Sequence, residues 1–139
     1  MKPKQTILSF TVALGLSLFA VPRSLAHHSR AGFDLSRNVT YQGLVKNYQL
    51  ENPHSYLVIT VSPDAKNSST VGTWTIEASS IDIMIHEGWS RMTYRPGDAI
   101  TVVAHPMKNG QKGALLFYAI KADGTRLYRA SHRYDSETE

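Results

Sequence analysis

The chain of 139 residues contains no cysteine. This absence excludes disulfide bonds, thiolate metal sites, thiol nucleophiles and redox-active cysteine pairs. The sequence also lacks a phosphate-binding glycine loop, the HExxH motif of zinc proteases and the GxSxG motif of serine hydrolases. The side chains that remain for a functional site are carboxylates, aromatic rings and six histidines.

Long apolar runs are also scarce, and the one that is present lies at the start of the chain. Residues 6–21, TILSFTVALGLSLFAV, carry no charge, follow the basic start MKPKQ and precede PRSLA. This run is shorter than the roughly 20 residues that a membrane-spanning helix needs. A basic segment, an apolar segment and a small-residue motif predict a secretory signal peptide, residues 1–26, that is cleaved after Ala26. The alternative is an uncleaved membrane anchor.

Cleavage would remove most of the excess of positive charge. The whole chain has 15 basic and 11 acidic residues, and three of the basic ones precede the expected cleavage site. The mature chain would then be close to neutral, so its charge gives no support to nucleic-acid binding. The form of the signal is typical of bacteria. We therefore expect a periplasmic protein with no nucleic-acid partner and no membrane attachment after cleavage.

Five segments have the alternating or β-branched pattern of strands. The first contains Gly43, which indicates a bend or bulge. A short segment, RLYR, follows the turn ADGT and predicts one further small strand. The five main segments are Thr40–Leu50, Tyr56–Val61, Val71–Ala78, Ala99–Ala104 and Ala114–Lys121.

One short helix is expected between the third and fourth strands. Ser79 and Ser80 are candidate N-caps, the apolar residues of IDIMI follow helical spacing, and Gly88 stands where a helix C-cap belongs. The order of three strands, a helix and two strands is that of the OB-fold, a five-stranded antiparallel barrel. The sequence therefore predicts a mainly β protein with a small OB-like barrel. An open antiparallel sheet or sandwich with one covering helix is the alternative.

The expected organisation is a single folded domain between two short segments. The signal peptide, residues 1–26, is followed by an N-terminal arm of the mature protein, residues 27–38. The OB-like barrel domain spans residues 39–129, and residues 130–139 form a flexible tail. About a hundred residues are enough for one core and too few for two.

Four motifs occur in the order HHSRAGFD, NPHSYL, PGD and DGTRL. Together they resemble an uncharacterised family of small secreted bacterial proteins, which is classed as a domain of unknown function. The resemblance covers Ala26–Leu127 and implies export and a small β domain, but no activity. Tyr56 stands where a tryptophan often follows Asn-Pro-His in that family, so the resemblance gives this ring no role.

The expected cleavage would create a metal chelate at the new N-terminus. His27 would then offer an α-amine and its Nδ1 atom to one ion, and His28 would add a second imidazole. If Ala26 were the first residue instead, His28 would be third, which gives an amine–amide–imidazole chelate for copper. Nitrogen ligands of this kind suit Cu(II), Ni(II) or Zn(II), and tetragonal geometry favours copper. The alternative is that both histidines are solvated residues without a ligand.

Two further histidines lie in connections that flank the ligand-binding face of an OB-fold. His54 lies between the first and second strands, and His105 lies between the fourth and fifth, followed by Met107. The hypothesis is that both histidines contribute to a metal site, with the Met107 thioether as a ligand for Cu(I). The alternatives are a turn-capping His54 and an exposed His105. His86 and His132 are interpreted as surface residues.

A second hypothesis is an oligosaccharide- or envelope-component-binding face. It would use Asn52, Tyr56, Trp74 and Met107, because aromatic rings of OB-folds stack on sugars and bases. A third and weaker hypothesis is a small hydrolase built on Glu51 and His54, which would work together as acid and base. Glu77, in the third strand, is the other carboxylate considered. The leading interpretation is a non-enzymatic binding module, with copper as the first candidate ligand.

Overall fold

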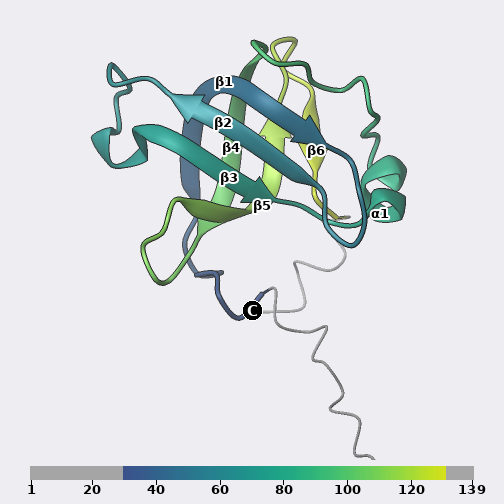
Figure 1. Cartoon of the computed structure of the whole chain (residues 1–139), viewed down its shortest axis with the longest axis horizontal. Helices are drawn as coiled ribbons and strands as arrows, with labels where there is room; N and C mark the ends of the chain where they lie inside the picture. Colours follow the sequence, from purple (N-terminus) through teal and green to yellow (C-terminus); the bar gives the residue numbers. More distant parts are fainter. Residues whose placement is uncertain (1–29, 131–139) are drawn as a thin grey trace, which may run out of the picture.

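The longest strand, β1 (Val39–Gln49), is shared by both halves of the sheet. In this computed structural model, which describes residues 30–130, its first half pairs antiparallel with β4 (Ala99–Pro106). Its second half pairs antiparallel with β2 (Tyr56–Val61), and the register shifts between Val45 and Asn47. The bend expected near Gly43 therefore lies where β1 passes from one partner strand to the other (Figure 1).

The sheet closes on itself through a short parallel pairing. Strand β3 (Gly72–Glu77) pairs antiparallel with β2 and, through its last three residues, parallel with β5 (Gly113–Ile120). Strand β5 also pairs antiparallel with β4, so the order β3-β2-β1-β4-β5 forms a closed five-stranded barrel. The short strand β6 (Arg126–Tyr128) adds to the free edge of β5. The predicted small OB-like barrel is confirmed.

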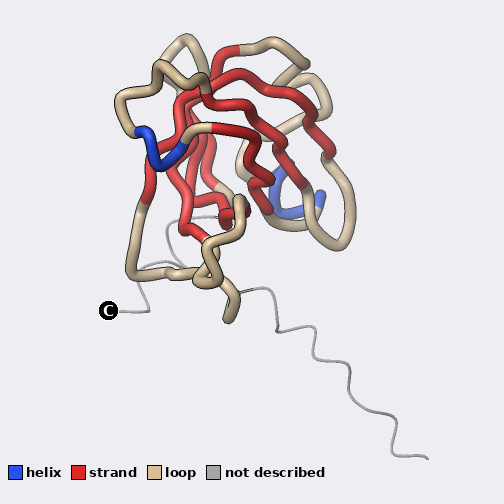
Figure 2. Tube along the Cα trace, turned by 60° about the vertical axis from the view of Figure 1, so that its left-hand side comes forward, coloured by secondary structure: helices blue, strands red, loops and turns tan. Residues whose placement is uncertain are grey.

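Two short helical segments lie outside the barrel wall, on opposite sides of the strands (Figure 2). The 3-10 turn η1 (Ser68–Thr70) precedes β3, and helix α1 (Ile81–His86) connects β3 to β4. The predicted position of the helix between the third and fourth strands is therefore confirmed. None of the helices in the described part of the chain has the length and apolar character that crossing a membrane requires.

Helix α1 begins as expected, although a different side chain caps it. Ser80 occupies the N-cap position, but its hydroxyl makes no capping hydrogen bond. The carboxamide oxygen of Asn52, in the β1–β2 loop, instead accepts a hydrogen bond from the backbone N–H of Ile81 at 3.0 Å. Gly88 ends the helical segment with a φ of +89°, a left-handed conformation that favours glycine. The capping contact ties the β1–β2 loop to α1.

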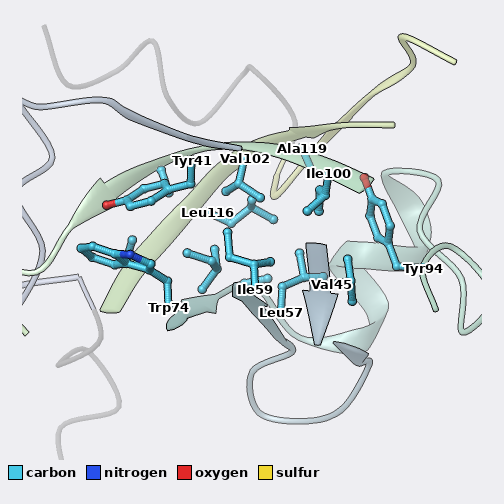
Figure 3. Close-up of a cluster of buried hydrophobic side chains, with 14 of the residues drawn as sticks. Tyr41, Val45, Leu57, Ile59, Trp74, Tyr94, Ile100, Val102, Leu116 and Ala119 are labelled. Carbon is cyan, nitrogen blue, oxygen red and sulfur yellow. The ribbon is translucent and has the colours of Figure 1, made fainter. Parts of the chain in front are cut away.

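The barrel interior is filled by residues that alternate along each strand. At one end, the rings of Tyr41 and Trp74 pack with their centroids 4.6 Å apart, and Tyr94 lies towards the other end (Figure 3). Between them lie aliphatic side chains from all five barrel strands, which exclude water and supply the main stabilising free energy. They include Val45, Leu57, Ile59, Ile76, Ile100, Val102, Ala104, Ala114, Leu116 and Ala119.

A smaller apolar layer lies outside this core. Val103 and Leu115 are buried but do not belong to the barrel core, because they alternate with core residues and face outwards. The described part of the N-terminal arm packs nearby, since Phe33 is 5% exposed and forms a bridge with Met107. Backbone hydrogen bonds from Asp34 to Pro106 and from Lys108 to Gly32, both 2.9 Å, hold the arm on the β4–β5 hairpin.

Gly43 gives a direct test of the way β1 bends. A Cβ atom at this position would collide with the backbone carbonyl of Thr60 on β2. We expect Gly43→Ala to lower the free energy of unfolding by about 1–3 kcal/mol, because overpacking forces the two strands apart. Urea unfolding followed by tryptophan fluorescence measures the change.

Gly32→Ala is the matched control for this substitution. A Cβ atom at Gly32 would meet no other atom within 4 Å, and Gly32 has no positive φ. The control should therefore unfold at the same urea concentration as the wild type. Equal stability of the two variants would show that β1 does not need a glycine at its bend.

Candidate functional site

The described residues bring one histidine and one carboxylate together at the end of the barrel wall. The Nδ1 atom of His54 lies 2.9 Å from Oε1 of Glu77. Glu77 is the last residue of β3 and pairs in register with Tyr56, the first residue of β2, so the loop that carries His54 reaches it directly. Of the two carboxylates considered from the sequence, the structure selects Glu77 and not Glu51 as the partner of His54.

The β1–β2 loop is held in place by buried backbone hydrogen bonds. The N–H of Ser55 donates to the carbonyl of Ser79 at 2.9 Å, and the N–H of Ala78 donates to the carbonyl of Ser55 at 2.8 Å. The hydroxyl of Ser55 also exchanges hydrogen bonds with the backbone of Glu51. Because Ser55 follows His54 in the chain, these bonds fix the position from which the imidazole approaches Glu77.

The contact with Glu77 determines which ring nitrogen of His54 donates a hydrogen bond. A carboxylate accepts hydrogen bonds, so Nδ1 of His54 is the donor in this pair. The opposite ring nitrogen, Nε2, then carries the lone pair of the neutral imidazole. The side chain of His54 is 33% exposed, whereas that of Glu77 is 19% exposed. The arrangement presents an oriented imidazole to solvent, supported by a half-buried carboxylate.

Charge at Glu77 is set by opposing effects. Burial raises the pKa of the Glu77 carboxyl above its ordinary value, whereas the nearby His54 and Arg129 lower it. Burial is the larger effect, because a charged carboxylate loses hydration that its neighbours only partly replace. Positive charge near the His54–Glu77 pair is therefore favourable.

Arg129 is a buried cation that the sequence did not indicate. Its side chain donates from Nε to the carbonyl of Leu116 at 2.8 Å and from a guanidinium nitrogen to the hydroxyl of Ser79 at 3.4 Å. The residue is 8% exposed. In the sequence it is one basic residue at the end of a short strand, and only the pairing of β6 with β5 brings it beside Glu77.

His105 lies on the same outer face as Glu77 but does not join the pair. Both residues are in register with Leu115 of the intervening strand β5. Two strand spacings separate their backbones, which amounts to about 10 Å. The ring of His105 bonds through Nδ1 to the carbonyl of Arg37 at 3.1 Å and packs against Phe117, with centroids 5.8 Å apart.

The four residues expected on a ligand-binding face have different environments, and the placement of Trp74 on that face is wrong. Trp74 is 8% exposed, belongs to the barrel core and donates its indole N–H to the carbonyl of Thr70 at 2.6 Å. It cannot stack on a ligand there, because the same alternation that puts Ile76 inside the barrel puts Trp74 inside.

The other three residues of that expected face lie at or near the surface. Asn52 is exposed but uses its side-chain oxygen to cap α1. Tyr56 is half-buried next to Glu77, and burial raises the pKa of its hydroxyl. Met107 is half-buried and lies against Gly113 and the arm residue Phe33. They are spread along the outer face rather than gathered around one point.

The remaining histidines are placed only in part. His27, His28 and His132 lie outside the described residues. The side chain of His86 is 85% exposed, so His86 is a surface residue, as expected. Its Nδ1 lies 3.5 Å from a carboxylate oxygen of Glu87. Within residues 30–130, no three histidine or acidic side chains form a group that could hold a metal ion. The His54–Glu77 pair is therefore the strongest candidate site in the described chain.

The raised pKa of Glu77 predicts how pH affects stability. The folded protein holds the Glu77 proton more tightly than the unfolded chain does. This contribution to stability is therefore fully present below the ordinary glutamate pKa of 4.5 and is lost as pH rises through the raised value. Glu77→Gln has no carboxyl group to titrate at this position. Its free energy of unfolding should therefore rise relative to that of the wild type as the pH increases from 4.5 to 7. Urea unfolding at several pH values measures the difference.

Glu51→Gln is the matched control, because Glu51 is exposed and lies in the same loop as His54. The control removes a carboxylate of the same loop without removing a buried one. A stability difference between Glu77→Gln and the wild type that does not change with pH would contradict the effect of burial on the Glu77 carboxyl.

Comparison with known families gives one match. The model of a family of unknown function, DUF6152, matches residues 16–116. The matched span includes both candidate sites, the His54–Glu77 pair and His105, and ends within β5. No curated protein matches the chain. The match covers most of the sequence and confirms the resemblance to an uncharacterised family: the chain belongs to the DUF6152 family of unknown function.

Proposed function

We propose that this protein is an exported, non-enzymatic module that binds a divalent metal ion, with copper as the first candidate. The observation that carries the proposal is the 2.9 Å contact between Nδ1 of His54 and the carboxylate of Glu77. Histidines that bind metals almost always donate their other ring N–H to a carboxylate or a backbone carbonyl. His54 has this arrangement, with Nε2 as the metal-binding atom.

The other ligands in the proposal come from the mature N-terminus. Cleavage after Ala26 would make His27 the first residue, so that an amine and two imidazoles become available together with His54. Nitrogen donors of this kind bind Cu(II) more tightly than other divalent first-row metals. The absence of cysteine is consistent with such a site, since no thiolate competes for the ion.

His105 offers a second nitrogen on the same face. Its Nδ1 is engaged by the carbonyl of Arg37, the other kind of partner that orients metal-binding histidines. We assign it a lesser role, because its backbone lies about 10 Å from that of Glu77 across two strand spacings. Met107 could supply a thioether to reduced copper near His105, since the two residues are separated by one position in the chain.

A copper titration with matched variants tests the function. Glu77→Gln keeps the size of the side chain but loses its charge, and it should weaken Cu(II) binding about 10- to 100-fold, as loss of a supporting carboxylate does. His54→Ala should weaken binding at least as much. Glu51→Gln should leave the dissociation constant unchanged. Isothermal titration of the mature protein with Cu(II) at pH 7 gives the constants.

Two outcomes of the titration would reject the proposal. If the wild type binds no Cu(II), the metal-binding function is wrong. If Glu77→Gln and Glu51→Gln bind Cu(II) equally, the site is not at His54. Mass spectrometry of the exported protein should precede the titration, because the identity of the first residue decides which N-terminal atoms are available.

The proposed role of the N-terminus has its own test. The chain that begins at His27 is compared with the same chain whose α-amine is acetylated. Acetylation removes the amine lone pair and should weaken Cu(II) binding about tenfold or more, because the chelate with the His27 imidazole can no longer form. Equal affinity of the two forms would exclude the terminal chelate while leaving His54 as a ligand.

A second candidate function is the binding of an oligosaccharide or another envelope component. The observation in its favour is a half-buried aromatic cluster formed by Phe117, Tyr118 and Tyr128 on β5 and β6, with neighbouring ring centroids 5.2–6.2 Å apart. Such rings stack on the apolar faces of sugars. This function would be lost on replacement of Phe117 and would not respond to Glu77→Gln.

A further inference from the structure

We propose that a hollow between the start of β1 and the β2–β3 loop binds the phosphate group of a small soluble molecule. The residues that line the hollow belong to segments 37–42 and 65–70, and its volume is about 480 Å³. Pockets for small organic molecules have volumes of roughly 300–1,000 Å³, so the hollow can hold more than the phosphate group itself. The hollow lies before the start of β3 and Glu77 lies at its end, a strand length of about 17 Å, so this inference goes beyond the proposed metal site.

The hollow exists because β1 changes its partner strand along its length. The pairing of β1 with β2 begins at Leu44, so residues 39–43 of β1 pair only with β4. The β2–β3 loop, which projects from the ends of these two strands in Figure 1, lies across the hollow from this unpaired edge. Val39 and Ala65 are half-buried, pack against the barrel core and form the apolar part of the lining.

Of the described residues, two cations and no carboxylate line the hollow. Arg37 and Lys66 come from its two opposite sides, and both are exposed. Within residues 30–130, neither side chain takes part in a hydrogen bond or an ion pair. Lys112 adds a third positive charge beside the hollow, since its Nζ donates a hydrogen bond to the carbonyl of Val71 at 2.8 Å. The lining therefore attracts an anion.

Two carboxylates of the neighbouring loops are engaged with their own segments. The hydroxyl of Ser36 lowers the pKa of the Asp34 carboxyl most, through a 2.6 Å hydrogen bond, and Arg37 lowers it less. Arg37 is therefore near Asp34 without forming an ion pair with it. Asp64 accepts a hydrogen bond from the hydroxyl of Ser62 at 3.4 Å. Neither carboxylate lines the hollow, so the positive charge of its lining is not cancelled there.

Neutral hydrogen-bond donors accompany the two cations. The side-chain oxygen of Asn67 accepts hydrogen bonds from the N–H and the hydroxyl of Ser69, so its amide nitrogen remains as a donor. Exposed amide and hydroxyl groups of Asn38, Thr40 and Gln42 also line the hollow. A phosphate monoester carries nearly two negative charges and three acceptor oxygens. It matches two cations and several donors better than a carboxylate does, and a guanidinium group binds it with two parallel N–H donors.

A buried donor without a partner lies next to Arg37. Tyr41 is 0% exposed, and its hydroxyl has no hydrogen-bond partner within the part of the chain that the structure describes. Burial raises the pKa of this hydroxyl to about 12, and the nearby Arg37 opposes the increase. Figure 3 shows the Tyr41 oxygen at the end of the barrel, beside Trp74. A buried hydroxyl without a partner is costly, so an acceptor held by Arg37 would lie near a donor that needs one.

Titration of the purified protein with glycerol 3-phosphate tests the proposal, with NMR detection of its two indole N–H groups. Trp74 donates its indole N–H to the carbonyl of Thr70, which lines the hollow, whereas Trp89 donates to the carbonyl of Tyr128 on β6. The ester should shift the Trp74 resonance and leave that of Trp89 in place, with a dissociation constant of about 1 mM or below. Acetate should bind at least about tenfold more weakly, because it offers fewer oxygens and less charge. Glycerol should not bind.

Four variants locate the binding site. Lys66→Gln and Arg37→Gln each remove one positive charge from the hollow and should weaken binding of the ester about tenfold. Arg37→Lys keeps the charge but loses the planar pair of donors, so its affinity should be intermediate. Lys46→Gln is the matched control, because Lys46 is equally exposed on β1 but does not line the hollow, and it should leave the constant unchanged. All three positions are exposed, so the variants should fold, and urea unfolding checks this.

Four outcomes would overturn the proposal. The first is a Trp74 resonance that glycerol 3-phosphate does not shift even at about 10 mM. The second is equal weakening by Lys46→Gln and Lys66→Gln, which would assign binding to the net charge of the protein. The third is equal affinity for acetate and the ester, which would remove the preference for phosphate. The fourth is binding to phosphatidylglycerol vesicles without binding to the soluble ester. None of these measurements uses Cu(II), so the metal function is tested separately.

Discussion

The parallel pairing of β3 with β5 is the contact on which the other features of the molecule depend. It joins only three residues of each strand, Thr75–Glu77 and Gly113–Leu115, yet it closes the barrel. Closure removes the edges that an open antiparallel sheet would expose. It also fixes Glu77 at the exact point where the β1–β2 loop returns, so the register of one short ladder sets the geometry of the candidate site. A slip of one residue would turn Glu77 into the core.

The candidate site follows from this register because three chain segments meet at the end of β3. The β1–β2 loop supplies His54, β3 supplies Glu77, and the residue after β6 supplies the buried guanidinium of Arg129. Backbone hydrogen bonds alone hold each of these segments in place. They include the bonds of Ser55 and the bond from the backbone N–H of Arg129 to the carbonyl of Phe117. The imidazole is therefore oriented by the fold, which lowers the entropy that a ligand would have to remove.

Much of the fold could be predicted from the sequence, because alternation with a period of two is a local property of a strand. The same alternation placed Trp74 with Ile76, on the side that proved to be the interior, and its assignment to a ligand-binding face conflicted with that pattern. Contacts between distant segments were less predictable. Proximity in sequence favoured Glu51 as the partner of His54, whereas the structure pairs His54 with Glu77, and nothing local indicated the buried Arg129. These contacts depend on which strands pair and in what register.

The balance of charge around Glu77 connects the site to its proposed ligand. Burial disfavours the carboxylate, and His54 and Arg129 only partly compensate for it. A divalent ion on Nε2 of His54 would add positive charge on the far side of the imidazole and so favour ionised Glu77. Ionised Glu77 in turn makes the imidazole a stronger donor to the ion. The two effects would reinforce each other, so a carboxylate whose burial is costly in this structure would become favourable if the proposed ion bound. An exposed carboxylate such as Glu51 has no burial cost to recover and could not couple the two states in this way.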